Sequence, residues 1–520
     1  MKKRSIIAIF LAGVLLISAF TGCGMTQQLT QAVNGFAIDG IADGGGLYEF
    51  APAETEPDWN TEEYKYQKEN SFQSVAANPF ATFAADVDTA SYSNFRRQVV
   101  NGQTVQPDSV RVEEFINYFQ YDYPEPQGDE PFAVTLEVAP CPWNEQTQLL
   151  SIGLQAKKLN AEELPRSNLV FLIDVSGSMY SENKLPLVQR SFLTLAENLD
   201  QNDLVSIVTY SSGEEIVLDG VNGGERQKIA AAIEGLQADG STRGDKAIEM
   251  AYELAERHYI EGGVNRVIMA TDGDFNVGVT SEGDLTRLVQ KEAKKGVFHS
   301  VLGYGMGNYK DSKLESMADN GNGNYAYIDS VDEARRVLVN EAGGTLFTVA
   351  KDVKLQVEFN PAAIKGYRLI GYENRVMSAT DFADDTKDGG EIGAGHQVTA
   401  LFEIVPVDSE FEIPEVDSKY GTNEGGSGEF ADELCTLNIR YKEPEGSEST
   451  LRTYPVTRDV IRETLSDNLR WAAGVAEAAM VLKDSAYKGS STYASAKDLL
   501  TPAATDDFRA EFLELLNKIG

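Results

Sequence analysis

Apolar strand-like segments alternate with amphipathic helical segments over about 165–347, and this alternation constrains the fold more than any other feature. The segment 168–176 is a continuous apolar run of the kind that parallel sheets bury on both faces, and further strands of the buried kind are predicted at 203–211, 264–272 and 296–305. Segments with helical spacing lie between and after them, at 184–199, 225–236, 244–259, 282–296 and 331–342. Repeated strands and helices imply right-handed crossovers and a central doubly wound, mostly parallel sheet. The sequence therefore predicts an α/β domain over 163–347.

Hydroxyl and carboxyl side chains follow the ends of these predicted strands. Asp174, Ser176 and Ser178 stand in "DVSGS" after the first run, Thr242 precedes a helix, and Asp272 ends the third run. Ligands of doubly wound sheets lie beyond the carboxyl ends of the strands. These oxygen donors suit Mg²⁺ best, with Mn²⁺ or Ca²⁺ possible, and suit Zn²⁺ poorly. The alternative is that the serines only satisfy backbone groups in the turn, which explains one loop and not three.

The three-part motif resembles the metal-ion-dependent adhesion site (MIDAS) of von Willebrand factor type A (VWA) domains, with "DVSGS" as D-x-S-x-S and Thr242 and Asp272 as the distant partners. Further stretches resemble a bacterial family of exported VWA proteins with their own N-terminal and C-terminal extensions: "DVDTASYSNFRR", "VRVEEFINYF", "PWN", "ATDGDFNVG" and "GNGNYAYID". The resemblance covers about 75–520. It implies that the two serines coordinate a metal directly, that the aspartates act partly through water, and that a partner's acidic side chain takes an open position.

The segments on either side of the α/β domain have different patterns. Over 76–162, an acidic turn and helical spacing followed by two alternating segments predict a small α+β module. Over 348–520, four alternating segments and two terminal helices predict a β-rich and helical module. One helix carries an apolar stripe for which core packing is favoured over a partner-binding face: Leu469, Ala472, Ala473, Ala476 and Met480. The sequence leaves open whether this module covers the metal face and whether Cys141 pairs with Cys435.

The N-terminus predicts export. Three basic residues precede an uncharged stretch, 5–20, that is typical of a signal-peptide core. The following "SAFTGC" resembles the bacterial lipobox, which implies a signal peptide over 1–22 and a lipid anchor on Cys23. Ordinary signal cleavage with Cys23 spare is the alternative. Residues 23–75 are acidic and rich in Gly, Gln and Asn, so we expect a flexible tether.

The net charge and the lack of a recognisable set of catalytic residues limit the classes of function that the chain can have. With 81 acidic against 45 basic residues and a net charge of −36, the chain repels nucleic acid. We therefore predict a membrane-anchored lipoprotein outside the cytoplasm that binds an acidic group on a partner protein through a divalent ion, and no enzyme. The alternatives are a metal-dependent hydrolase and an envelope-complex scaffold that acts through its flanking modules.

Overall fold

A computed structural model places most of the chain from residue 62 onward. It describes residues 62–85, 88–159, 164–242, 245–273, 282–306, 311–341, 347–387, 389–413, 430–444 and 446–520. These residues belong to one compact unit, Asp58–Gly520. The predicted signal peptide, Cys23 and most of the predicted tether lie outside the described residues. No helix within the described ranges is long and apolar enough to cross a membrane.

The α/β domain contains a six-stranded sheet with the order β10-β9-β8-β5-β6-β7. Its strands are β5 (Ser167–Asp174), β6 (Leu204–Tyr210), β7 (Glu214–Asn222), β8 (Val264–Thr271), β9 (Phe298–Gly303) and β10 (Tyr325–Tyr327). All neighbours are parallel except β6 and β7. The central strand β5 is buried at every position, as expected for a strand covered on both faces. The predicted α/β fold with a mostly parallel sheet is confirmed.

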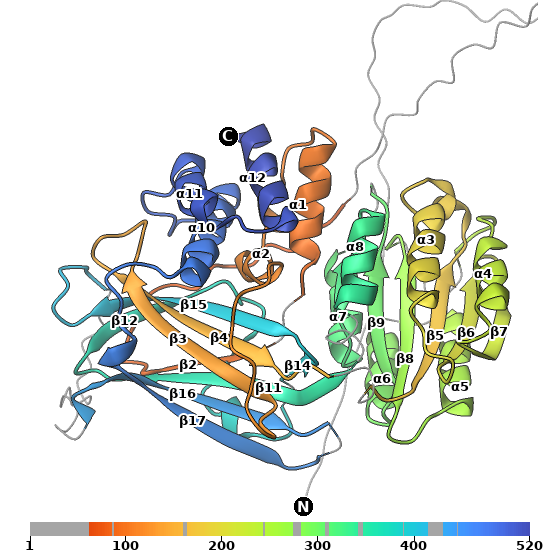
Figure 1. Cartoon of the computed structure of the whole chain (residues 1–520), viewed down its shortest axis with the longest axis horizontal. Coiled ribbons are helices and arrows are strands. Elements are labelled where there is room, and N and C mark those ends of the chain that lie inside the picture. The colour runs from red at the N-terminus through yellow and green to blue at the C-terminus, as the bar shows by residue number, and fades with distance from the viewer. Residues whose placement is uncertain are drawn as a thin grey trace, which may run out of the picture. The chain divides into compact units, whose positions relative to one another are not determined.

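Helices cover both faces of this sheet (Figure 1). One face packs against α3 (Leu185–Ala196), α4 (Arg226–Glu234), α8 (Val331–Arg335) and the π-helix Arg336–Asn340 that continues α8. The other face packs against α5 (Asp245–Arg257), α6 (Glu282–Ala293) and α7 (Asp311–Asn320). Because each helix buries its apolar side on the sheet, each sheet face has a separate hydrophobic core.

Strands from both flanking segments pair with one another in two antiparallel sheets. Their orders are β1-β12-β15-β4-β3 and β13-β2-β11-β16-β17, with β14 paired to β11. The strands are β1 (Gln73–Ser74), β2 (Phe80–Ala84), β3 (Phe132–Pro140), β4 (Gln148–Ala156), β11 (Thr348–Phe359), β12 (Ile364–Ile370), β13 (Val376–Met377), β14 (Gly390–Gly393), β15 (Gln397–Pro406), β16 (Glu433–Lys442) and β17 (Ser449–Thr457). The two sheets share one hydrophobic core. The segments before and after the α/β domain therefore build one β-sandwich, and the α/β domain is inserted between its strands.

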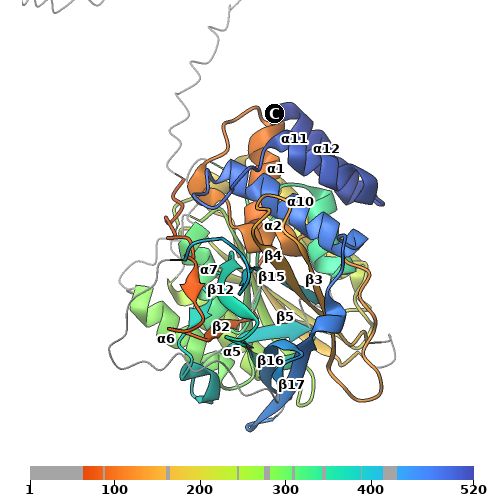
Figure 2. The same ribbon diagram turned by 90° about the vertical axis from the view of Figure 1, so that its left-hand side faces the viewer.

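A helical layer covers the sheet that contains β4 and β15 (Figures 1 and 2). It consists of α1 (Ala90–Val100), α2 (Val112–Asn117), α10 (Asp467–Leu482), α11 (Tyr493–Leu500) and α12 (Asp507–Ile519). Short 3₁₀ helices are η1 (Pro107–Ser109), η2 (Gly177–Tyr180), η4 (Asp381–Ala383), η6 (Arg458–Val460) and η7 (Thr501–Ala503). Ser466 caps α10 by accepting a hydrogen bond from the Leu469 amide at 3.2 Å. All five residues of the predicted apolar stripe on α10 are buried, which confirms the core-packing interpretation.

The first described residues, 62–75, extend along the flanking module. The Arg97 guanidinium donates to both carboxylate oxygens of Glu62, at 2.7 and 2.9 Å. The ring of Phe72 packs against that of Phe411, with 4.8 Å between the centroids. Strand β1 then pairs with β12. This part of the expected tether is therefore bound to the folded unit.

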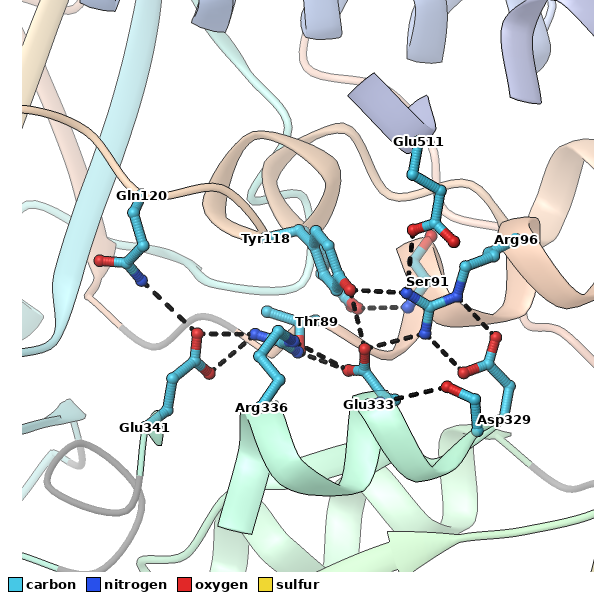
Figure 3. A network of polar contacts seen from close by, with 12 residues as sticks. Thr89, Ser91, Arg96, Tyr118, Gln120, Asp329, Glu333, Arg336, Glu341 and Glu511 are labelled. Atoms are coloured by element: carbon cyan, nitrogen blue, oxygen red, sulfur yellow. Dashed lines mark hydrogen bonds and ion pairs between the residues drawn. The ribbon is translucent and has the colours of Figure 1, made fainter. Parts of the chain in front are cut away.

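Buried ion pairs join α1 to the end of the α/β domain (Figure 3). Arg96 of α1 donates to Asp329 at 2.7 Å and to Glu333 at 2.8 Å. Arg336 donates to Glu333 at 2.6 Å and pairs with Glu341 at 2.7 Å. The two arginines neutralise carboxylates that burial would otherwise make costly. The inserted domain is thus held by ion pairs, as well as by chain connectivity, to the β-sandwich and its helical layer, which together are called the host module below.

Candidate metal centre

The carboxyl ends of β5 and β8 lie side by side at one edge of the α/β sheet. The strands are parallel neighbours, with Ile173 opposite Ala270. Asp174 ends β5 and Asp272 directly follows β8. Both side chains are almost inaccessible, at 0% and 1% exposed. Sheet register therefore brings together two carboxylates that are nearly a hundred positions apart in the sequence.

The loop after β5 forms the 3₁₀ helix η2 and presents two hydroxyls. The Ser176 amide donates to Asp174 Oδ1 at 2.9 Å, and the Ser176 and Ser178 Oγ atoms are 3.0 Å apart. Met179, within η2, is fully buried in the core, which anchors the turn. Ser176 is buried and Ser178 is exposed, so the hydroxyl pair runs from the interior to the surface.

The loop that contains Thr242 is bonded to the serine loop through its backbone. The Gly177 amide donates to the Gly240 carbonyl at 3.0 Å, and the Asp239 amide donates to the Val175 carbonyl at 2.8 Å. Thr242 follows two residues later and is half-buried. The structure therefore brings this loop to the same edge as Asp174.

Asp272 has a buried cationic neighbour. The Lys184 ammonium donates to Asp272 Oδ2 at 2.8 Å, and these side chains are 10% and 0% exposed. Thr271 donates from its hydroxyl to Asp174 Oδ2 at 3.4 Å and accepts from the Gly273 amide at 3.2 Å. The two carboxylates are thus held by different donors.

Burial and charge shift the ionisation of the site. Burial raises the pKa of Asp174 to about 6, the neighbouring charge of Asp272 adds to the rise, and hydrogen bonds from Ser176 oppose it. Burial, followed by the charge of Asp174, raises the pKa of the Tyr210 phenol well above its usual value. Tyr210 therefore stays a neutral hydroxyl beside Asp174.

The donor set fits a hard divalent cation. Octahedral Mg²⁺ holds oxygens at about 2.1 Å, so neighbouring ligand oxygens lie about 3.0 Å apart. The two serine hydroxyls are hydrogen-bonded to each other, and their Oγ atoms, 3.0 Å apart, already have this separation. Nowhere in the described ranges, this site included, is a group of three or more His, Cys, Asp or Glu side chains placed to hold a metal; the set described here has two carboxylates and three hydroxyls. The assignment of Asp174, Ser176, Ser178, Thr242 and Asp272 as ligands stays a prediction.

Sequence reasoning missed three residues at this edge: Lys184, Tyr210 and Thr271. Thr271 directly precedes the predicted ligand Asp272 at the end of a predicted strand, so its place near the site could have been predicted from the sequence. Lys184 stands at the N-terminal end of a predicted helix, where the helix dipole disfavours a cation. That unfavourable placement was a signal that a local carboxylate compensates. For Tyr210, only its position at the end of β6 indicated that it could lie near the site.

The two remaining cysteines are both buried and free. Cys141 follows β3 and Cys435 lies in β16. Burial raises the pKa of both thiols above the ordinary value. They act as small apolar residues of the core in the described part of the chain.

Comparison with known families defines the class of the inserted domain. The model "von Willebrand factor type A domain" matches residues 168–339, which contain the sheet and all three loops of the candidate site. The model "von Willebrand factor" matches residues 58–151. The fold and the loops at its edge are those of a VWA domain, a class that typically mediates protein interactions or adhesion.

The chain belongs to the YfbK family. It is 42% identical over 467 residues to "Uncharacterized protein YfbK" of Escherichia coli (strain K12), which covers 88% of this chain and 80% of that protein. The model "Uncharacterized protein YfbK, C-terminal" matches residues 344–520. A second relative, "Uncharacterized protein sll0103" of Synechocystis, is 28% identical over 36% of this chain and 43% of its own length.

Solved structures resemble the chain at lower similarity. A von Willebrand factor type A protein from Catenulispora acidiphila is 17% identical, covers 77% of this chain and 91% of its own, and has a TM-score of 0.43. BatB from Bacteroides thetaiotaomicron is 19% identical, covers 34% of this chain and 97% of its own, and has a TM-score of 0.29.

Proposed function

We propose that this chain is an exported, lipid-anchored binding protein whose VWA domain binds an acidic side chain of a partner protein through a divalent cation. The observation that carries the proposal is the pair of hydroxyls of Ser176 and Ser178, whose Oγ atoms are 3.0 Å apart. They lie at the carboxyl ends of β5 and β8, where Asp174 and Asp272 are also placed. A bound divalent ion supplies an electrophilic position that accepts a carboxylate oxygen. Mg²⁺ fits this set best, with Mn²⁺ or Ca²⁺ as alternatives.

Access to the site supports a binding role. Ser178 is exposed, and Tyr180 at the end of η2 is 82% exposed. In the described part of the chain, this side of the site is therefore open to solvent and not covered by the β-sandwich. An aromatic side chain beside an open polar site is typical of protein interfaces.

The environment of the site favours binding over hydrolysis. Among the described residues, the neighbours of Asp174 and Asp272 include the Lys184 side chain and the hydroxyls of Ser176, Thr271 and Tyr210. The two carboxylates belong to the predicted ligand set, and the hydroxyls among these neighbours are not general bases for water near neutral pH. His299 lies at the start of β9, at the opposite edge of the parallel sheet.

Crosslinking in intact cells, with and without chelator, tests the proposal. We expect one partner to crosslink to the wild type and to be lost with chelator or in Asp174→Ala. The matched control is Asp129→Ala, which removes an exposed carboxylate from the turn before β3. Crosslinks that survive both treatments would favour a scaffold that acts through the flanking module. Turnover of phosphoesters or peptides that is lost in Asp174→Ala would instead identify a hydrolase.

A further inference from the structure

The lysine at the start of α3 is buried inside the candidate metal centre. Lys184 Nζ lies 2.8 Å from Asp272 Oδ2, and the lysine side chain is only 10% exposed. Lysine is rarely this buried unless a carboxylate pairs with it. The helix dipole opposes a cation at this end of a helix, so the pair with Asp272 is what holds the ammonium there.

A glycine makes room for the lysine stem. Gly305 has a φ of +76°, and a Cβ at this position would lie 2.4 Å from Lys184 Cε and 2.7 Å from its Cγ. The Tyr327 hydroxyl donates to the Gly305 carbonyl, which fixes the loop. A side chain at residue 305 would displace the lysine, so the backbone forms a slot shaped for this stem.

The lysine changes the charge balance of the site. Asp174 and Asp272 supply two negative charges when ionised, and Lys184 supplies one positive charge. Their sum is −1 without a divalent ion and +1 with one. Removing Lys184 makes these sums −2 and 0. The lysine therefore repels a divalent cation, and with that cation present it keeps the centre positive towards an incoming anion.

We propose that Lys184 is a built-in counter-charge that weakens metal binding and strengthens the binding of a carboxylate at the metal. This inference rests on the proposed function of the site. It predicts opposite effects of one substitution on two ligands. A lysine that merely orients Asp272 as a ligand would have the reverse effect on the metal, because its loss would weaken metal binding.

The test compares Lys184→Met, which keeps the apolar stem, with Lys184→Gln, which offers Asp272 an uncharged amide donor. Lys228→Met, which removes an exposed lysine of α4, is the matched control. Calorimetry with Mn²⁺ alone gives the metal affinity. Relaxation of ¹³C-acetate by the Mn²⁺-loaded protein then reports carboxylate binding at the metal. Thermal melting in chelator shows whether each variant is folded.

We expect both Lys184 variants to bind Mn²⁺ about tenfold more tightly and acetate about tenfold more weakly than the wild type. Unchanged or weaker Mn²⁺ binding in a folded variant overturns the inference and leaves the proposed function standing. Unchanged acetate binding also overturns it. If the wild type binds no Mn²⁺ or Mg²⁺, the proposed function fails and the inference fails with it. If Lys184→Met does not fold, Lys184→Gln decides.

Discussion

The Arg96 guanidinium of α1 donates to the Glu333 carboxylate of α8 at 2.8 Å, and this contact joins two parts of the chain that are 237 residues apart. Burial alone would raise the pKa of Glu333, but Arg336 and Arg96 outweigh it and lower that pKa to about 2. Glu333 is therefore ionised at any physiological pH. Its negative charge is compensated by Arg336 of the VWA domain and also by Arg96 of the host module.

Removal of Arg96 should destabilise the protein strongly. Arg96→Met leaves Asp329 and Glu333 buried with one guanidinium fewer, and we expect a loss of about 3–5 kcal/mol in the free energy of unfolding. Urea denaturation of the full chain measures it. The control is Arg452→Met, which breaks an exposed pair with Glu130 and should cost less than about 1 kcal/mol. Equal losses in the two variants would contradict the role of Arg96.

Metal should stabilise the native state. At a hundredfold excess over Kd, Mg²⁺ should add about 2.7 kcal/mol to the free energy of unfolding, so Tm should rise with added metal. Asp174→Ala should remove most of this rise and leave the domain folded, because the residue lies at the end of β5. Ser176→Ala and Thr242→Ala should each weaken the rise less, since each deletes a neutral donor. An unchanged rise in Asp174→Ala would exclude it as a ligand.

A buried carboxylate in the helical layer predicts a pH dependence that is independent of the metal. Burial raises the pKa of Glu477 on α10 to about 7, although Ser491 and Ser495 oppose the rise. Because the folded pKa exceeds the ordinary value of 4.5, the folded state binds this proton more tightly than the unfolded state. The contribution of Glu477 to stability therefore falls as pH rises from about 4.5 to about 7.

Glu477→Gln should remove that penalty. We expect the variant to be more stable than the wild type at pH 8, by on the order of 3 kcal/mol. The difference should vanish below pH 4, where the glutamic acid is neutral in both states. Urea denaturation at the two pH values measures it. A difference of equal size at both would show that packing, and not ionisation, distinguishes the side chains.

Local patterns were enough to predict the α/β fold of the inserted domain. The run that becomes β5 is continuously apolar from Leu169 to Ile173 because helices cover both faces of the sheet, and this signal needs no knowledge of distant residues. The edge position of Asp174 and Asp272 follows from the same rule for parallel strands. The partners Lys184 and Tyr210 could not be predicted in this way, because which side chain turns toward the site depends on loop geometry.

The pairing of strands in the β-sandwich could not be predicted from local sequence patterns. The pairing of β2 with β11 and of β4 with β15 joins segments on opposite sides of the inserted domain. Alternation identifies longer strands such as β4, β11 and β15, but it carries no information about which strand pairs with which. The two flanking segments were therefore predicted as separate modules, one α+β and one β-rich and helical. In the structure their strands share one hydrophobic core.

The lipid anchor can be tested without structure, since Cys23 lies outside the described residues. If Cys23 carries lipid, the wild type should partition into detergent. Cys23→Ser should accumulate as uncleaved precursor or be released from the membrane. Cys141→Ser is the control, because it removes a buried thiol and should leave partitioning unchanged. A processed Cys23→Ser protein that still partitions into detergent would refute lipidation there.

The shared sandwich predicts that its two halves depend on each other. Residues 76–162 alone would expose the edges and apolar faces of β2 and β4, and 348–520 alone would lose the strands that flank β11 and β15. We expect each half to be insoluble or unfolded by circular dichroism. Residues 163–347 should unfold cooperatively on their own, because helices of that segment cover both faces of its sheet. The two halves produced together should copurify as a folded pair. A cooperative melt of 76–162 alone would show that the shared core is not needed for its folding.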